Sequence, residues 1–284
     1  MINFVKRRNL DVLKYDDCIE NSLQSRVYAF SWYLDIVANN WGVLVLNDYE
    51  AVMPIPFNTK YFIKYATQPY FCQQLGIFSK NVLSEELQRK MLHKIPFKFV
   101  KVALSLNAKN LLVAEDERRK NYILKLHKEY VDLQKDFSKG RKHAIKVGEK
   151  AGLNLLPIPI DKLIEIQNKN YKYKIPEAKL KNLAKVFLQN NKGNILGVFK
   201  DNVLLGGGFF IKDKHKVVYL YSAFTAEGRR LQAASFLIAN IIKKYQNSNI
   251  VLDFEGGNLP NIGKFYRSFG AEEEVYATFN KAFL

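Results

Sequence analysis

The first half of the chain alternates between apolar residues spaced as in helices and apolar residues spaced as in strands. Helical spacing predicts helices over residues 24–38 and, after a capping Ser84, up to about His93. Alternating positions predict a hairpin that turns at Asn47-Asp48. The strands predicted in this half are residues 41–46, 51–55, 61–65, 74–78, 97–105 and 120–126. This half is therefore expected to mix helices with strands.

The second half predicts a strand, two helices, a three-stranded meander, a helix, a strand, a helix and a final strand. The predicted strands are residues 153–157, 194–199, 203–211, 216–223, 249–254 and 272–282. The predicted helices are residues 161–173, 177–190, 228–246 and 259–269. Gly206-Gly207-Gly208 inside one strand indicates a bulge or a close approach by a ligand or a helix, for packing or for binding. The two halves share an order of elements, which favours two copies of one fold.

A basic segment separates the two halves. Ser138 is a good helix N-cap, Gly152 is a natural helix stop, and residues 135–150 hold six Lys or Arg against two acids. We therefore predict an N-terminal domain over residues 1–137, a basic connecting helix over residues 138–152, and a C-terminal domain over residues 153–284.

Composition limits the class of protein. With 48% hydrophobic and 13% aromatic residues, a chain of 284 residues can form packed cores. No run of 18 apolar residues occurs and the N-terminus lacks the apolar core of a signal peptide, so no membrane span is expected. Cys18 and Cys72 lack paired spacing, which predicts neither zinc nor a disulfide framework and favours the cytoplasm.

The formal net charge of +17 favours an anionic partner. RNA, a phosphorylated carrier and an anionic lipid head group are the candidates. Because lysine is more frequent than arginine, a surface that serves only solubility is the alternative interpretation. The four histidines are scattered, and the sequence shows no catalytic triad, metal site or Walker loop.

Two motifs resemble the GNAT acyltransferase fold. Residues 201–208, a polar turn followed by apolar residues and glycine, are similar to a GNAT strand, and Tyr266 stands four residues before Gly270 as in the GNAT ending. The resemblance implies an α/β fold of two tandem GNAT-like domains, each a mostly antiparallel sheet flanked by helices. Gln232 departs from the pattern, because the GNAT pyrophosphate loop has a glycine there.

The Fem family, which has two GNAT-like domains in one chain, is the closer resemblance. The basic helix 138–152, the stretch 220–237 and the strand end 252–257 follow one another in the Fem order. Fem proteins transfer amino acids from aminoacyl-tRNA to the peptide of a cell-wall precursor, and the resemblance implies a similar transfer here. The Fem pattern has a Lys where this chain has Tyr266, and the Fem coiled-coil arm has no counterpart.

A strand followed by a turn and a helix near residues 225–235 predicts a site for an anionic acyl carrier. Arg229 and Arg230 are expected in the first turn of the helix, where a bound phosphate would offset their unfavourable position in the helix dipole. The alternative is that both are solvated surface residues. The expected donor-binding or phosphate-binding residues are Thr225, Arg229, Arg230, Ala234, Lys264 and Arg267.

Three side chains are candidates for catalysis. Tyr266 would protonate a leaving thiolate or ribose oxygen, or else pack its helix onto the sheet with Phe265 and Phe269. Asp253 and Glu255 are predicted on one face of a strand end. One of them would act as a base or order a water, or the pair would bind backbone amides and lysines.

Polar and aromatic residues gather in the first half of the sequence and are expected to line a substrate cleft. They are Trp32, Gln68, Tyr70 and Gln73.

Two kinds of function remain open at this stage. The first is an N-acyltransferase without a metal, which passes an acyl or aminoacyl group from acyl-CoA or aminoacyl-tRNA to an amine. A conventional coenzyme A-dependent GNAT enzyme is the narrower form of that hypothesis. The second is a non-catalytic two-domain protein that binds RNA or an anionic glycan through its basic surface.

Overall fold

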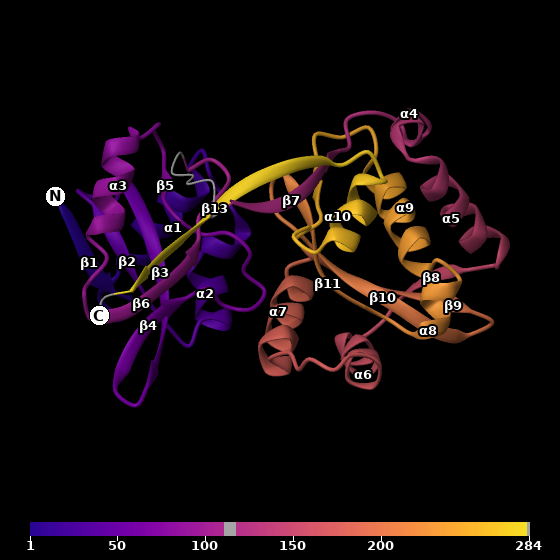
Figure 1. Ribbon diagram of the computed structural model, residues 1–284, viewed down its shortest axis with the longest axis horizontal. Helices are drawn as coiled ribbons and strands as arrows, with labels where there is room; N and C mark the ends of the chain where they lie inside the picture. The colour runs from indigo at the N-terminus through magenta and orange to yellow at the C-terminus, as the bar shows by residue number, and fades with distance from the viewer. Residues whose placement is uncertain (111–117, 283–284) are drawn as a thin grey trace. The chain divides into compact units, whose positions relative to one another are not determined.

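The computed structural model describes residues 1–110 and 118–282, and the chain forms two compact units (Figure 1). Unit 1 comprises Met1–Arg119 and Val275–Leu284, and unit 2 comprises Lys120–Glu274. The last strand, β13 (Glu272–Ala282), therefore begins in unit 2 and continues in unit 1. Each unit combines helices with a mostly antiparallel sheet, which confirms the predicted α/β fold class. Among the described residues, no helix has the length and apolar character needed to cross a bilayer.

The division of the chain differs from the predicted boundaries. Helix α5 (Lys139–Lys150), expected to connect two domains, lies inside unit 2. The Ile145 side chain of this helix is buried in the core of unit 2. A Cβ atom added to Gly148 would lie 3.0 Å from the Cβ of Phe236. The helix belongs to unit 2 because one of its faces is packed there, although its sequence is largely basic.

Unit 1 is built on a sheet in which β1, β2, β3 and β4 are antiparallel neighbours. Strand β6 then pairs with β4 in parallel and with β13 antiparallel, and β5 pairs with β3. The strands are β1 (Ile2–Lys6), β2 (Asn40–Leu46), β3 (Ala51–Lys60), β4 (Ile63–Thr67), β5 (Phe78–Ser79) and β6 (Phe99–Ser105). The helices are η1 (Arg7–Asn9), α1 (Val12–Glu20), η2 (Val27–Ala29), α2 (Ser31–Val37) and α3 (Glu85–His93).

Alternate residues of β2 face opposite layers of unit 1. The Trp41 ring lies 5.5 Å from the Tyr15 ring of α1, whereas Leu44 faces the cluster that contains Met91 of α3. The predicted helix 24–38 is shorter than expected, because the extended Phe30 separates η2 from α2. Strand β1 and helix α1 were not predicted.

Unit 2 contains a sheet in the order β7, β12, β11, β10, β9, β8, in which only β11 and β12 are parallel. The strands are β7 (Arg118–Lys125), β8 (Asn154–Pro157), β9 (Gly193–Lys200), β10 (Val203–Lys212), β11 (Lys216–Phe224) and β12 (Val251–Asp253). The helices besides α5 are α4 (Tyr130–Leu133), η4 (Gln134–Asp136), α6 (Ile160–Asn170), α7 (Glu177–Gln189), α8 (Ala226–Arg230), α9 (Ala233–Tyr245) and α10 (Pro260–Arg267).

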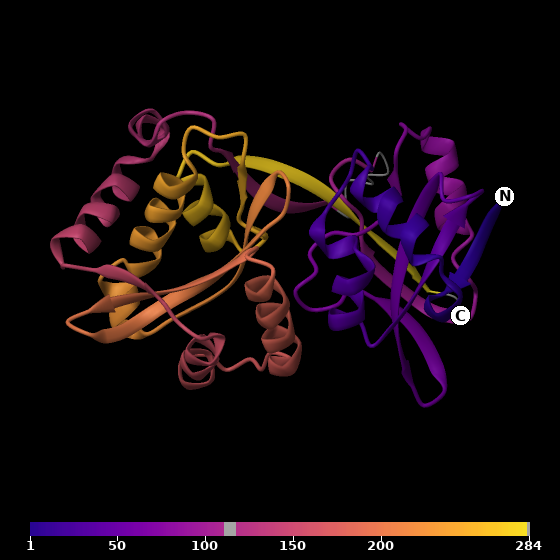
Figure 2. The ribbon, with the colours of Figure 1, turned by 180° about the vertical axis from the view of Figure 1, so that it is seen from behind.

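Helices cover both faces of the sheet in unit 2. Helices α6 and α7 lie on one face, and α5 and α9 lie on the other (Figures 1 and 2). Phe209 of β10 packs against Phe187 of α7, with ring centroids 6.3 Å apart. Its neighbour Phe210 stacks on Tyr219 at 4.8 Å within the core beneath α9. Strand β10 is therefore buried on both sides, as its long apolar run predicts.

Close packing explains the three glycines of β10. A Cβ on Gly207 would lie 2.1 Å from the carbonyl oxygen of Leu196, and one on Gly208 would lie 2.7 Å from the ring of Tyr219. The ladder with β9 also shifts register between Leu204 and Gly206, which is the expected bulge. These glycines serve packing between strands.

We expect Gly207→Ala and Gly140→Ala to change stability in opposite directions. The first places a methyl group against a backbone carbonyl and should lower the free energy of unfolding by about 2 kcal/mol. The second lies in α5 with nothing within 4 Å of the new atom and should raise it by about 0.5–1 kcal/mol. Urea unfolding of both variants measures the difference. Equal effects would contradict this account of β10.

Candidate functional site

Strands β11 and β12 pair only briefly before they separate. Their parallel ladder joins Lys216 to Val251 and ends where Val218 faces Asp253. Residues 219–224 of β11 continue along β10 on the other side. Beyond Val218, therefore, the edge of β11 that faces β12 has no backbone pairing with β12 among the described residues. An unpaired edge beside a parallel neighbour can accept the backbone-like groups of a ligand.

The chain that leaves β11 forms two helices where the sequence predicts one over residues 228–246. Thr225 caps α8, since its hydroxyl oxygen accepts a hydrogen bond from Gly228 N at 3.0 Å and donates one to Leu205 O at 3.0 Å. Gln232 then adopts a left-handed conformation with φ of 61°, which ends α8 and starts α9. Arg229 and Arg230 consequently lie in the last turn of α8, where the dipole favours a cation. Their expected place in a first turn was wrong.

Both arginines have partners within unit 2. The Arg229 Nη1 donates to Phe224 O at 2.7 Å and to the Tyr171 hydroxyl at 3.4 Å, at the end of β11. Arg230 forms an exposed ion pair with Glu227 at 2.5 Å. Arg229 therefore orders the end of the strand, whereas Arg230 is held at the surface.

The N-terminus of α9 has no side-chain cap. Its first internal hydrogen bond runs from Phe236 N to Gln232 O at 3.0 Å, so the preceding amides of residues 233–235 point out of the helix. Ala234, an expected donor-binding residue, is in this turn. The uncapped amides and the helix dipole make this end attractive to an anion.

A buried arginine lies beside the same helix end. Arg141 of α5 is 9% exposed; its guanidinium donates to Ser235 Oγ and to Ser268 Oγ, the latter at 2.8 Å. It lies over the rings of Phe265 and Phe269, at 4.1 Å and 4.6 Å from their centroids. Burial lowers the pKa of Arg141 to about 10. Arg141 thus places a positive charge beside the first turn of α9, and its bond to Ser268 links α5 to the end of α10.

Tyr266 packs in an aromatic cluster near Glu255. Its ring stacks on Phe254 at 4.6 Å and meets Phe265 edge-on at 5.6 Å, so it packs with Phe265 as expected, and its catalytic role stays a prediction. Burial, and then the nearby Glu255, raise the pKa of Tyr266 well above its usual value. Burial also raises the pKa of Tyr219, with a smaller contribution from Tyr266. The Tyr266 hydroxyl therefore keeps its proton at neutral pH.

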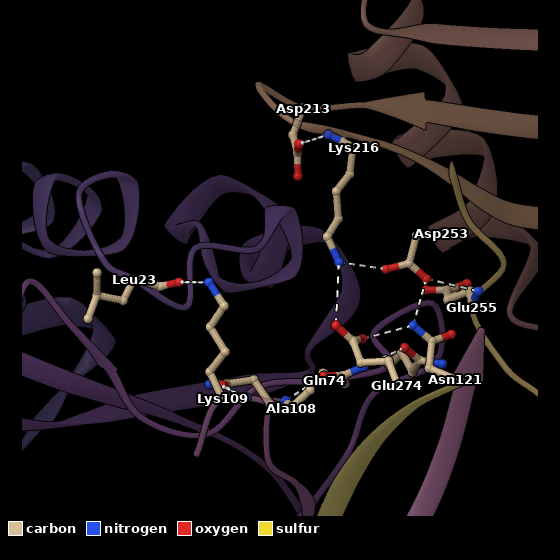
Figure 3. A network of polar contacts seen from close by, with 12 residues as sticks. Leu23, Gln74, Ala108, Lys109, Asn121, Asp213, Lys216, Asp253, Glu255 and Glu274 are labelled. Atoms are coloured by element: carbon tan, nitrogen blue, oxygen red, sulfur yellow. Dashed lines mark hydrogen bonds and ion pairs between the residues drawn. The ribbon is translucent and has the colours of Figure 1, made fainter. Parts of the chain in front are cut away.

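Asp253 is held in a polar network (Figure 3). It is 1% exposed, and its carboxylate contacts Lys216 Nζ at 3.0 Å, Asn121 Nδ2 at 2.9 Å and the Glu255 amide at 3.1 Å. Asn121 also donates to Glu274 at 3.0 Å. For Asp253, these bonds to a backbone amide and a lysine are the contacts predicted as the alternative to a catalytic role.

Glu255 does not share a strand face with Asp253. Strand β12 ends at Asp253, and Glu255 adopts a left-handed φ of 53°. The hydrogen bond from the Glu255 amide to Asp253 Oδ1 turns the chain at this point. The expectation of one shared face was therefore wrong, because a strand of three residues ends before Glu255.

The two basic residues of α10 differ in role. Arg267 donates to the Tyr122 hydroxyl at 2.8 Å and lies 3.7 Å from Glu273, so it fixes α10 to β7. Lys264 is exposed on the same helix. Both side chains are exposed, but only that of Arg267 also has this structural role among the contacts of the described residues.

The predicted cleft residues Trp32, Gln68, Tyr70 and Gln73 all belong to unit 1. Gln68 donates to Cys72 O at 2.8 Å and accepts a hydrogen bond from Ser105 N at 3.2 Å, which holds the loop after β4. Tyr70 is 62% exposed, and Trp32 stacks near Phe30. These contacts stabilise unit 1, and a cleft role stays a prediction.

Sequence reasoning did not single out several residues of this site. Tyr171, Lys216, Asn121 and Arg141 come from separate elements, and no motif joins them. A signal existed for Arg141, because it shares the buried face of α5 with Ile145 at a spacing of four residues.

Comparison with known proteins identifies the fold. No family model and no curated protein matches the sequence. Solved structures do match: FemX has a TM-score of 0.69 at 10% identity and covers 96% of each chain. A tandem GNAT protein from the clavulanic acid biosynthesis pathway scores 0.53 at 10% identity, covering 99% of this chain and 98% of its own. The L-PGS from Bacillus licheniformis scores 0.53 at 11% identity, covering 95% of this chain and 91% of its own. The chain thus has the Fem/GNAT-like fold of these proteins, with two domains in tandem.

We expect Gln232→Gly to be tolerated and Gln232→Val to destabilise unit 2. A side chain in the left-handed region costs about 1–2 kcal/mol, and a β-branched one fits it least. Glycine should therefore leave the free energy of unfolding unchanged or raise it by up to about 1 kcal/mol, although it loses the Ser235 contact to Gln232 Oε1. Thermal unfolding of both variants checks this order. A larger loss with glycine would show that the side chain is needed.

Proposed function

We propose that this protein is an N-acyltransferase of the GNAT/Fem type. It passes an acyl or aminoacyl group from an anionic carrier, acyl-CoA or aminoacyl-tRNA, to an amine. The observation that carries the proposal is the early separation of β11 from β12, next to the uncapped N-terminus of α9. An unpaired strand edge, a positive helix end and a protonated tyrosine then lie along one stretch of unit 2. The Fem resemblance implies a cell-wall precursor as the acceptor.

The carrier phosphates bind at the N-terminus of α9 in this proposal. The amides of residues 233–235 and the helix dipole supply the attraction, and Arg141 adds a buried positive charge through Ser235. Arg229 supports the site by ordering the end of β11. Thr225 fixes the entry to α8, and Lys264 and Arg267 lie on α10, where Lys264 is exposed to further phosphate.

Tyr266 is the general acid of the proposed reaction. The neutral amine attacks the acyl carbon, the bond from that carbon to the carrier sulfur or ribose oxygen breaks, and an amide bond forms. Tyr266 donates its proton to the leaving atom, Glu255 takes the proton that the amine loses, and transfer of that proton from Glu255 to the Tyr266 oxygen returns both groups to their starting state. Tyr266 is protonated at neutral pH, as the acid of this step must be, although its raised pKa makes it a weaker acid than an exposed tyrosine.

Asp253 and Glu255 have unequal parts in this mechanism. Asp253 is engaged by Lys216 and Asn121, so its role is to end β12 and position the turn. Glu255 follows that turn and lies close enough to Tyr266 to raise its pKa. We propose Glu255 as the group that receives the amine proton.

A thermal-shift titration with a matched pair of variants tests the donor site. Ala234→Glu and Ala178→Glu each place a carboxylate at the second position of a helix, α9 and α7 respectively. Both should raise the free energy of unfolding by about 0.3–1 kcal/mol through the helix dipole. Only Ala234→Glu should abolish the stabilisation by a phosphate-bearing donor.

The probes are acetyl-CoA, uncharged tRNA and aminoacylated tRNA at low salt. A rise in Tm with acetyl-CoA that Ala234→Glu removes supports coenzyme A as carrier. A rise with tRNA that is larger when it is aminoacylated supports Fem-like transfer. If no probe raises Tm, or if Ala178→Glu removes the response equally, the proposed donor site is wrong.

Tyr266→Phe should lower the rate of transfer much more than it weakens binding of the donor. Loss of a general acid costs about 10²–10⁴-fold in kcat. Tyr245→Phe removes another tyrosine hydroxyl of unit 2 and serves as the control. Because the pKa of Tyr266 is raised, wild-type kcat should show no alkaline decline due to this group below pH 10. Equal kcat in both variants would remove Tyr266 from the mechanism.

A binding function without catalysis is the second candidate. The net charge of +17 and the exposed lysines of α5, Lys139, Lys146 and Lys150, favour it. Binding of RNA through this helix would weaken steeply as salt rises, and loss of one lysine would reduce that slope by about one. Absence of any acyl transfer together with such binding would favour this candidate.

A further inference from the structure

The hairpin of β3 and β4 projects beyond the other strands of unit 1 (Figures 1 and 2). Strand β3 pairs with β2 only as far as Phe57, whereas its pairing with β4 continues to the last pair, Lys60 and Ile63. Tyr61 and Phe62 therefore form the whole turn between the two strands. The proposed acyl-transfer site lies in unit 2 and uses none of these residues.

Three large apolar side chains, those of Tyr61, Phe62 and Ile63, form the hairpin tip. Tyr61 is 83% exposed, Phe62 is 100% exposed and Ile63 is 52% exposed. Single apolar residues are common on protein surfaces, but three consecutive ones at a projecting point expose a continuous apolar patch to water. Exposed patches of this kind mark contacts with another protein or with a membrane.

The turn places both aromatic residues in a backbone conformation that suits asparagine or glycine. Tyr61 has a φ of 48° and Phe62 has a φ of 64°, the left-handed values of a two-residue turn of type I′. Such turns strongly prefer Asn-Gly, and bulky side chains are unfavourable there. The chain therefore keeps two aromatic residues where they strain the backbone and remain exposed. Strain held in this way is typical of functional sites.

The charge around the hairpin tip is positive. Lys60 and Lys64 flank the tip and are exposed, and the Lys60 ammonium lies 5.4 Å from the centroid of the Tyr61 ring. Residues 51–84, which include both strands of the hairpin, contain no aspartate or glutamate. Apolar side chains between lysines match a bilayer with anionic lipids, because the rings can enter the boundary between head groups and acyl chains while the ammonium groups stay at the phosphates.

The size of the hairpin tip favours a bilayer over a protein partner. A buried phenylalanine or tyrosine covers about 150–250 Å², so three side chains supply at most roughly 600 Å². A stable protein–protein interface takes about 800 Å² from each partner. A bilayer requires no complementary groove, since an apolar side chain enters among its head groups and gains affinity in proportion to the apolar area that it buries.

We propose that the β3–β4 hairpin docks this protein on the surface of a membrane that contains anionic lipid. Tyr61 and Phe62 insert between the lipid head groups, and Ile63 adds its exposed part to the buried apolar surface. Lys60 and Lys64 contact the lipid phosphates. The pairing of β3 with β4 holds the tip in its docking conformation, so binding requires no change in the hairpin.

Sedimentation with lipid vesicles tests the proposal. The full chain should bind vesicles of phosphatidylglycerol mixed with phosphatidylcholine. Binding to vesicles of phosphatidylcholine alone should be about tenfold weaker or more, because the lysines then have no anionic surface to contact. Higher salt should weaken binding to the mixed vesicles for the same reason.

The double variant Tyr61→Asn, Phe62→Gly separates docking from folding. It gives the turn the residues that type I′ prefers, so Tm without vesicles should stay the same or rise, while binding to mixed vesicles should fall about tenfold or more. Leu13→Gln replaces another apolar residue of unit 1, one that is 85% exposed, and should leave binding within about twofold. Leu13 is a suitable control because its neighbour Lys14 binds Asp48, in the turn at the opposite end of β3.

Lys60→Met and Lys64→Met should each weaken binding about threefold to tenfold. Lys185→Met removes an exposed lysine of α7 and should leave binding within about twofold. The proposal is wrong if the mixed vesicles bind no protein, or if the double variant binds them as well as the wild type does. The second outcome would assign binding to the basic surface as a whole. If vesicles bind no protein and the double variant loses a self-association seen in velocity sedimentation, the hairpin tip contacts a second copy of the chain instead.

Discussion

The buried carboxylate of Asp253 is the interaction on which unit 2 depends. Lys216 at the start of β11, Asn121 in β7 and the Glu255 amide all bind it. A buried charge without partners costs several kcal/mol, so these contacts must form together. The same bonds end β12 after three residues and turn the chain away from β11. One satisfied charge thus decides where two parallel strands stop pairing.

The position of that separation explains the rest of the candidate site. Because β12 ends early, the later half of β11 keeps an edge that β12 does not cover, and the chain after it runs into α8 and α9. The left-handed Gln232 then gives α9 its own N-terminus instead of extending α8. Arg141 and Tyr266 are held against this region by stacking on Phe265 and Phe254, so their positions depend on packing more than on charge.

The positively charged residues of the chain differ in how much they affect stability and binding. Many lysines are exposed and solvated, and surface ion pairs such as Arg230–Glu227 contribute little to stability. Charge matters at Arg141, which is 9% exposed and whose partners are hydroxyls and aromatic rings. There the protein keeps a cation largely desolvated, which favours an anionic ligand over water.

The sequence by itself determined the fold class and much of the order of elements, though not β1 or α1, because local spacing and caps act over a few residues. Ser84 and Ser138 cap α3 and α5 as predicted, and the meander of unit 2 follows its predicted strands closely. Only the tertiary structure decided that β13 is shared between the units, that residues 228–246 form two helices, and that Asp253 pairs with Lys216. Such choices depend on contacts between residues far apart in the chain, and those contacts offset backbone strain and desolvation that no local pattern records.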